Sequence, residues 1–252
     1  MAPDGSPAAP QPLPPHPPLS RYYGDERERR RRIEAWFDQA APAYDWIGQA
    51  ASLGSGHRYR RQALLRAGLA GGMRVLDVGC GTGVLAAHAR GIVGPGGSAV
   101  ALDPSLGMLR ETGRRGVSRR VRALGEELPF ADGSFDLLSM GYALRHVADL
   151  RAAFREYRRV LRPGGKVLLL EITRPEGRFS QRLARLFFGR LVPRLSRLRG
   201  GRSTQELMEY YWDTIERCVP PATILAALED AGFTKAGRRV EKGILSDYSA
   251  VR

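Results

Sequence analysis

Cysteine, histidine and lysine are all scarce in this chain of 252 residues, which contains 2, 4 and 3 of them. Two cysteines cannot build a disulfide framework, and four scattered histidines do not supply the spacing of a zinc site. We therefore expect a reducing, cytoplasmic setting and no metal ligands.

Long apolar runs and a secretory signal are also missing. The longest strongly apolar run covers residues 167–170, whereas a helix that spans a bilayer needs about 20 apolar residues. The chain is therefore expected to be soluble, or at most peripheral to a membrane.

Positive charge is abundant, but one residue type supplies almost all of it. Lysine and arginine total 40 against 26 acidic residues, a formal balance of +14, and 37 of the 40 are arginines. Such a balance indicates an anionic partner, for example a nucleic acid, a phosphate or a membrane surface. GC-rich coding produces the same arginine bias without any partner, so charge alone does not decide the function.

The chain divides into three parts by composition. Eight of the 17 prolines lie in residues 1–20, which predicts a disordered tail whose removal changes neither binding nor activity. Residues 21–70 are expected to be helical, because apolar side chains recur there at helical spacing, at Ile33, Trp36, Phe37 and Ala40. Residues 71–252 are expected to form the main domain.

From Met73 onward, short apolar strands alternate with helical stretches, the strands being RVLDV, SAVALD, VRAL, FDLLSM and KVLLLEI. This alternation predicts parallel strands with crossover helices, an α/β fold with a doubly wound sheet. Residues 176–216 then form an Arg-rich helical insertion. A helix and two strands, residues 233–240 and 243–251, complete a mostly parallel seven-stranded sheet whose last strand is antiparallel.

The sharpest motif is VLDVGCGTG at residues 75–83, a strand that ends in three glycines and leads into a helix. Glycines there let the backbone approach a nucleotide closely. Gly81, Gly83 and Ala86 also match a dinucleotide pattern, so the motif alone leaves a dehydrogenase open. Asp103 ends the second strand, where its carboxylate can accept ribose hydroxyls in either class. Asp77 either caps the turn or contacts the cofactor.

Further segments separate the two classes. The stretches EELPFADGSFDLLSM and YRRVLRPGGKVLLLE, at residues 126–140 and 157–171, are typical of S-adenosylmethionine methyltransferases. FDQAAPAYD, SLGSGHRYRR and ALRHVAD stand at residues 37–45, 52–61 and 143–149. With these motifs, the chain from Ile33 to Arg252 resembles the ubiquinone/menaquinone-biosynthesis C-methyltransferases, a branch of the class I methyltransferases with a Rossmann-like fold.

The resemblance implies S-adenosylmethionine as cofactor and S-adenosylhomocysteine as product, with the helices of residues 21–70 covering the active site. Leu124 stands where the family has an acidic or amide residue, so backbone groups are expected to hold the adenine. The cofactor-binding residues that it implies are Tyr44, Asp77, Gly79, Gly81, Gly83, Asp103, Pro104, Met108, Gly125 and Glu126.

On the acceptor side, methylation at carbon needs an ionised ring hydroxyl and a base for the ring proton. Tyr142, Arg145 and His146 follow strand four, at the carboxyl edge of the sheet. The near-neutral pKa of histidine suits His146 to base work through an ionisation near neutrality, and the alternative is a hydrogen bond to its own loop.

Family placement adds a second acceptor-side group from the insertion. It implies Asp213 and Glu216 as competing catalytic candidates. It also implies Tyr211 and Trp212 as substrate-binding residues.

Residues 177–202 form the basic part of the insertion. Residues 176–202 contain eight arginines and one acid. Phe179, Leu183, Leu186 and Phe187 fall on one helical face. The pattern predicts a basic amphipathic helix that binds anionic lipid or an anionic acceptor, or one that only covers the site as a lid.

The function that these features favour is C-methylation of a small quinol, phenol or isoprenoid-type acceptor. Alternatives are an O- or N-methyltransferase of a secondary metabolite, an RNA methyltransferase, and an enzyme that uses S-adenosylmethionine without transferring methyl. No nucleic-acid partner is expected, because strand four lacks the Asn/Asp-Pro-Pro-aromatic and Pro-Cys segments of base methylation. The sequence leaves the acceptor, the methylated atom and the oligomeric state open.

Overall fold

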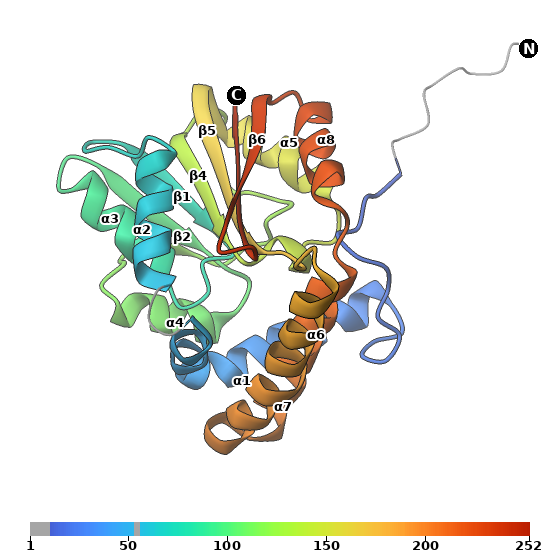
Figure 1. The fold of residues 1–252 in the computed structure, drawn as a ribbon. Helices are drawn as coiled ribbons and strands as arrows, with labels where there is room; N and C mark the ends of the chain where they lie inside the picture. The colour runs from blue at the N-terminus through green and yellow to red at the C-terminus, as the bar shows by residue number, and fades with distance from the viewer. Residues whose placement is uncertain (1–10, 53–55) are drawn as a thin grey trace, which may run out of the picture.

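A computed structural model describes residues 11–52 and 56–252 of the chain (Figure 1). The helices are α1 (Glu26–Ser52), α2 (Gly56–Arg66), α3 (Val84–Val93), α4 (Leu106–Arg114), α5 (Leu150–Val160), α6 (Arg178–Leu186), α7 (Val192–Arg217) and α8 (Pro221–Asp230). A short 3-10 turn, η1 (Leu144–His146), precedes α5, and a π-helical turn, η2 (Phe187–Leu191), joins α6 to α7.

The strands are β1 (Arg74–Val78), β2 (Ser98–Leu102), β3 (Arg120–Val121), β4 (Phe135–Gly141), β5 (Leu161–Ile172), β6 (Thr234–Glu241) and β7 (Leu245–Val251). They form one seven-stranded sheet in the order β3-β2-β1-β4-β5-β7-β6. The first five strands are parallel, and β7 lies antiparallel to both β5 and β6. The predicted fold is confirmed, including the antiparallel last strand.

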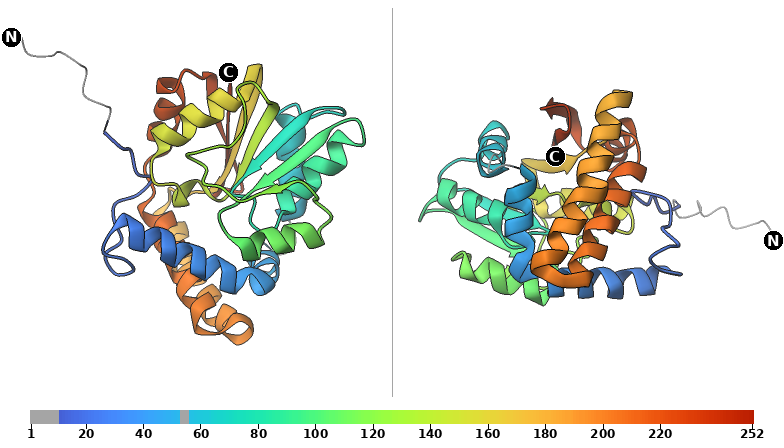
Figure 2. Two further views of the ribbon diagram at one scale, coloured as in Figure 1. Left: turned by 180° about the vertical axis from the view of Figure 1, so that it is seen from behind. Right: turned by 60° about the horizontal axis from the view of Figure 1, so that its bottom comes forward.

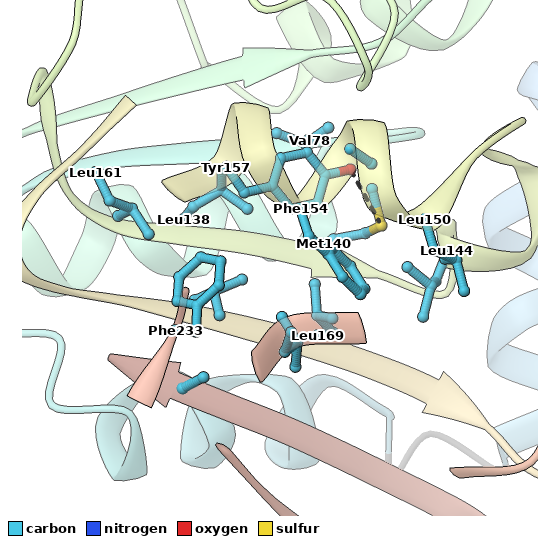
Figure 3. Packing of buried hydrophobic residues seen from close by; sticks show 14 of the residues in the cluster. Val78, Leu138, Met140, Leu144, Leu150, Phe154, Tyr157, Leu161, Leu169 and Phe233 are labelled. Atoms are coloured by element: carbon cyan, nitrogen blue, oxygen red, sulfur yellow. Dashed lines mark hydrogen bonds between the residues drawn. The ribbon is translucent and has the colours of Figure 1, made fainter. Parts of the chain in front are cut away.

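Two layers of helices cover the sheet because successive residues of a strand point to opposite faces. In β4, Leu137 packs with residues of α2 and α3, whereas Leu138 packs with α5 and α8. The same alternation separates Leu168 from Leu169 in β5. Figure 3 shows the second face, where Leu138 and Leu169 lie with Phe154 of α5.

The predicted helical insertion forms a hairpin, which we call the α6–α7 hairpin (residues 178–217). The chain reverses direction at Gly201, inside α7. Its φ of 71° and ψ of −166° belong to a conformation almost restricted to glycine. The hairpin and α1 lie together beyond the edge of the sheet (Figures 1 and 2). Within the described part of the chain, no helix is both long and apolar enough to cross a membrane.

The prediction of a disordered tail is wrong for residues 11–20. Leu13 donates its N–H to Asp149 Oδ1 (2.9 Å) and accepts from the N–H of Leu150 (2.9 Å). The carbonyl of Pro15 accepts from Val219 N (2.8 Å), and Leu19 is only 2% exposed. Prolines restrict the free chain to extended conformations, so this segment loses little entropy when it docks. Residues 1–10 of the predicted tail lie outside the described residues.

Docking of residues 11–20 also changes the expectation for truncation. Residues 11–23 form a continuous segment along the domain, which we call the N-terminal strap. Removing residues 1–20 would expose the apolar cluster around Leu19, Tyr22 and Trp36, so the deletion is no longer expected to be silent.

Candidate functional site

A cavity of about 510 Å³ opens at the carboxyl ends of β1, β2 and β4. This edge is where the strand order reverses, between β1 and β4, the usual position of a ligand crevice in an open α/β sheet. The remaining walls come from α1, α2 and the α6–α7 hairpin, together with α4, the loop after β3 and the turn between β6 and β7. The cavity therefore lies between the sheet and the elements that extend beyond it.

The glycine turn after β1 forms the floor of the cavity. Gly79 has a φ of 61°, and a Cβ there would lie 2.6 Å from the Cβ of Ala143, so only glycine fits. Gly79 and Gly81 line the cavity. Gly83 does not line it, and a Cβ at Gly83 would instead meet Thr112 at 2.8 Å. Gly83 therefore lets the turn pack closely on α4.

Two buried aspartates face this turn. Asp103 Oδ2 accepts from the N–H of Gly81 (2.9 Å), and Oδ1 accepts from the N–H of Ser105 (2.9 Å). Burial raises the pKa of Asp103 to about 6, against the opposing effect of the two amides. Each carboxylate oxygen retains a lone pair for a further donor.

Asp77 is more deeply placed. Its Oδ1 accepts from Ser139 Oγ (2.7 Å), whereas Oδ2 is buried without a hydrogen-bond partner among the described residues. Burial raises the pKa of Asp77 to about 7. The side chain lines the cavity, so a cationic ligand group there would stabilise its ionised form.

The other predicted cofactor residues also lie on the cavity wall, namely Tyr44, Pro104, Met108, Gly125 and Glu126. Glu126 Oε1 accepts from the N–H of Ala148 (2.5 Å), which ties the loop after β3 to the start of α5. Leu124 lines the cavity as well, beside Gly125.

Helix α1 is fastened to the nucleotide side by two aspartates that the sequence analysis missed. Asp38 Oδ1 accepts from Ser105 Oγ (2.5 Å) and from Gly107 N (2.8 Å) at the start of α4. Asp45 accepts from Thr82 Oγ1 (2.5 Å) in the glycine turn and pairs with Arg115. Acidic residues are common on exposed helix faces, so their spacing alone carries no signal for these contacts.

Arg60 of α2 is a further cavity residue that the sequence analysis missed. Its guanidinium lies 4.8 Å from the centre of the Tyr142 ring and forms no ion pair within the described chain. Tyr142 has a φ of 63°, an unusual value for a residue with a side chain. Sequence analysis did not single out Arg60 because several other arginines surround it in the chain.

On the acceptor side, His146 lines the cavity from η1. Its Nδ1 lies 3.5 Å from the hydroxyl oxygen of Tyr210, whose ring stacks on the imidazole at 5.7 Å. Its Nε2 is buried without a partner among the described residues. Burial, with the positive charges of Arg145 and Arg29, lowers the pKa of His146 well below its ordinary value. The ionisation expected near neutrality is therefore displaced to lower pH.

Arg145 lies behind this turn rather than on the cavity wall. Its side chain and that of Glu171 are almost fully buried and form an ion pair at 2.8 Å. Glu171 Oε1 also accepts from the N–H of Leu144 (2.9 Å), and Arg145 donates to Thr214 Oγ1 (3.2 Å) in α7. Arg145 thus positions η1 and α7, and does not itself reach the cavity.

The four candidates from α7 separate into two groups. Tyr211 and Trp212 line the cavity, whereas Asp213 and Glu216 do not. Asp213 Oδ2 accepts from the hydroxyl of Tyr22 (2.8 Å), and Glu216 pairs with Arg185 of α6. Both carboxylates therefore hold elements of the fold in place.

The buried ion pair gives a stability prediction. Glu171→Gln should lower the free energy of unfolding by about 3 to 5 kcal/mol at pH 7, because Arg145 keeps its charge with no counter-ion. Urea denaturation measures this difference. Glu206→Gln, which removes the exposed pair with Arg202, should cost less than about 1 kcal/mol. Equal small losses in both variants would contradict the role given to Glu171.

Comparison with known proteins gives matches over most of the chain. Residues 25–251 match the model of the ubiE/COQ5 methyltransferase family. A ubiquinone/menaquinone biosynthesis C-methyltransferase of Shewanella woodyi is 32% identical over 229 residues, covering 86% of this chain and 90% of that protein. A demethylmenaquinone methyltransferase of Mycobacterium sp. strain KMS is 31% identical over 221 residues, covering 87% and 94%.

Solved structures show the same fold at lower identity. A possible histamine N-methyltransferase of Thermotoga maritima has a TM-score of 0.62 and 18% identity, covering 86% of this chain and 98% of that one. Phosphoethanolamine N-methyltransferase 2 of Haemonchus contortus, in complex with S-adenosylmethionine, has a TM-score of 0.61 and 18% identity, covering 85% and 57%. Both share the fold of this chain.

Proposed function

Because the chain belongs to the ubiE/COQ5 methyltransferase family, it is an S-adenosylmethionine-dependent methyltransferase, and we propose that it methylates a ring carbon of a small quinol, phenol or isoprenoid-type acceptor. The observation that supports this acceptor is the lining of the cavity, which includes the glycine turn and a set of apolar side chains from the α6–α7 hairpin. These side chains are Phe188, Val192, Met208, Trp212 and Ile215. A flat ring with an apolar substituent suits such a space.

The residues present fit the cofactor. The unpartnered Oδ2 of Asp77 would accept from the ammonium of the methionine moiety, and Gly79 and Gly81 would let the backbone approach it. Asp103 would accept from the ribose hydroxyls, and Met108 with the backbone of Leu124 to Glu126 would hold the adenine. Arg60 would pair with the carboxylate. When bound, the cofactor supplies an electrophilic methyl group on its sulfonium.

The Asp77 assignment predicts how cofactor affinity depends on pH. A bound ammonium favours the ionised carboxylate, so binding below about pH 7 must release the proton that burial keeps on Asp77. Affinity should therefore rise as pH increases from about 5.5 and level off above about pH 7. Calorimetry in buffers of different ionisation enthalpy measures this release. Asp77→Asn should remove the release that occurs near pH 7 and leave only the smaller part, at lower pH, from Asp103, whose pKa is raised to about 6.

Asp103→Ala provides the comparison for Asp77→Asn. It should weaken binding about ten- to a hundred-fold through loss of a charge-assisted contact, while the proton release of Asp77 remains. Tighter binding of NADH than of S-adenosylmethionine would contradict the proposed site.

Methylation at carbon requires the protein to position the acceptor ring and to remove a proton from it. The acceptor ring must be held so that a carbon faces the methyl group, and its proton must leave after the new carbon–carbon bond forms. His146 is the candidate base, because its lowered pKa keeps the imidazole neutral and able to accept a proton at pH 7. The guanidinium of Arg29, on the cavity wall beside the His146 turn, favours an ionised ring hydroxyl.

His146→Ala tests this role. Turnover should fall about 10²- to 10⁴-fold while S-adenosylmethionine affinity stays nearly unchanged, because the histidine acts on the acceptor side. In the wild type, turnover should fall only as pH drops below the ordinary range of histidine, since the protonated imidazole cannot accept a proton. That acid limb should vanish in the variant.

Asp213→Asn is the matched control for His146→Ala. An amide at Asp213 can still accept from Tyr22, so near wild-type turnover is expected. Loss of turnover in Asp213→Asn with retention in His146→Ala would overturn the assignment. The assay uses methyl-labelled S-adenosylmethionine with reduced quinones and simple phenols. Product NMR identifies a new carbon-bound methyl, and methyl only on oxygen or nitrogen would refute the proposed reaction.

We further propose that the α6–α7 hairpin contacts an anionic membrane surface. Its inner side contributes apolar side chains to the cavity lining, while its outer side exposes Phe179, Leu183, Leu186, Leu191, Leu195 and Leu198. Arginines flank these side chains, and of those described only Arg185 and Arg202 pair with a carboxylate. Apolar side chains beside excess positive charge match a surface of anionic lipid.

Co-sedimentation with vesicles tests this contact. Binding to vesicles with anionic lipid should exceed binding to neutral vesicles and should fall as salt rises, because exposed charges are screened over about 8 Å at physiological ionic strength. Leu183→Ser combined with Leu198→Ser should weaken it, since these side chains are 57% and 81% exposed. Leu106→Ser, exposed elsewhere, should not. Equal binding to neutral and anionic vesicles would leave the hairpin as a lid only.

A further inference from the structure

The N-terminal strap lies before residue 25, where the family match begins. Its first part is fastened to α5 and to the segment before α8 by the hydrogen bonds of Leu13 and Pro15. Its last part meets α7, where Tyr22 donates to Asp213 (2.8 Å). The strap therefore spans the outer side of the elements that carry His146 and Tyr210.

His16 stands in the middle of the strap and is only 4% exposed. Its Nδ1 lies 2.8 Å from the carbonyl oxygen of Pro17, and its Nε2 is buried without a hydrogen-bond partner among the described residues. Burial lowers the pKa of His16, and the nearby charges of Arg29 and Arg145 lower it further. Burying the Nε2 atom of His16 without a hydrogen bond costs free energy that an apolar side chain would not cost.

The strap also contacts Tyr210, the α7 residue that stacks on His146. The rings of Tyr22 and Tyr23 meet the ring of Tyr210 edge-on, with centroids 5.4 and 6.5 Å away. Tyr210 in turn stacks on His146 at 5.7 Å. The strap thus supports the aromatic ring that fixes one face of the His146 imidazole.

The backbone of the His146 turn is held from the same side. Arg29 of α1 donates to the carbonyl oxygens of His146 (2.9 Å) and Val147 (3.1 Å). Arg29 is itself buried and pairs with Glu26. Strap, α1 and α7 therefore converge on one short turn.

We propose that the N-terminal strap is a positioning element of the acceptor site, which holds His146 through Tyr210 and places His16 behind the turn that carries it. The inference rests on the proposed role of His146 as base. The strap keeps the imidazole in one orientation and shields it from water, so that it stays neutral beside the acceptor.

The groups that face His146 determine the direction of the expected effect. They are Arg145 of η1, Arg29 of α1, His16 of the strap, and the rings of Phe37, Tyr210 and Tyr211. The two arginines stay charged at every pH of interest. Replacing His16 by a neutral, smaller side chain removes one repelling group and admits water, and both changes raise the pKa of His146.

His16→Asn tests the proposal in the full-length protein, because asparagine can keep the hydrogen bond to Pro17 and removes the titrating ring. With selectively labelled histidine, NMR follows the four histidine rings of the wild type and the three that remain in the variant as pH changes. The His146 signal should titrate about half a unit to one unit higher than in the wild type. The acid limb of kcat should move by the same amount, with cofactor affinity unchanged.

His88→Asn is the matched control, since His88 Nε2 lies 3.2 Å from His57 Nδ1 and no contact between His88 and the strap is found among the described residues. It should leave the His146 signal in place. Tyr22→Phe is a milder second variant that breaks only the bond to Asp213, and it should shift the His146 signal in the same direction by less. If both strap variants fold, bind cofactor and leave the His146 titration unchanged, the strap is only structural and the proposal fails.

The NMR result does not depend on the acceptor. A shifted His146 signal in a protein that methylates no ring carbon would refute the proposed function and leave the positioning effect of the strap established. An unshifted signal with normal carbon methylation would refute the positioning role of the strap and leave the proposed function standing.

Discussion

The ion pair between Arg145 and Glu171 is the interaction on which the acceptor side depends. Two opposite charges lie out of water at 2.8 Å, where their attraction is strong and an unpaired charge would be costly. The pair joins three elements, because Glu171 belongs to β5, Arg145 to η1, and Arg145 also bonds to Thr214 of α7. Because His146 is the last residue of η1, this ion pair also fixes the position of His146.

Charge is arranged differently at the two ends of the cavity. At the nucleotide end, burial raises the pKa of Asp77 and Asp103 above that of ordinary aspartates. These carboxyl groups therefore keep a proton more readily in the free protein and become fully ionised when a cationic ligand binds. At the other end, Arg29 contributes permanent positive charge beside the His146 turn. A cationic donor and an acceptor that must become anionic would each meet the charge that favours it, which is consistent with methyl transfer to an ionised phenol.

The parts of the structure that follow from local sequence were predictable. Short apolar runs that alternate with helical stretches predicted the strands and the doubly wound sheet, and the glycines of residues 75–83 identified the nucleotide end. Contacts between distant segments were not predictable. Asp38 and Asp45 act only because α1 folds back over α4 and the glycine turn. Proline-rich composition indicated disorder in residues 11–20, whereas the anchors of that segment, such as Asp149 and Val219, are far away in sequence.

Side chains on α7 show the same limit. Motif position alone gave Tyr211, Trp212, Asp213 and Glu216 equal standing, but a helix turns about 100° per residue, so neighbours point in different directions. Tyr211 and Trp212 reach the cavity, while Asp213 and Glu216 face Tyr22 and Arg185. Helical phase relative to the cavity depends on how α7 packs against α1, which no local pattern encodes.

The use of arginine in the α6–α7 hairpin separates two environmental responses of the molecule. Guanidinium groups keep their charge throughout the physiological pH range, so the outer face of the hairpin is sensitive to ionic strength and insensitive to acidity. The cavity has the opposite character, because Asp77 and His146 exchange protons while low-dielectric walls protect them from dissolved salt. The proposed surface attachment would therefore respond to electrolyte, and the chemistry of the cavity to proton concentration, independently of each other.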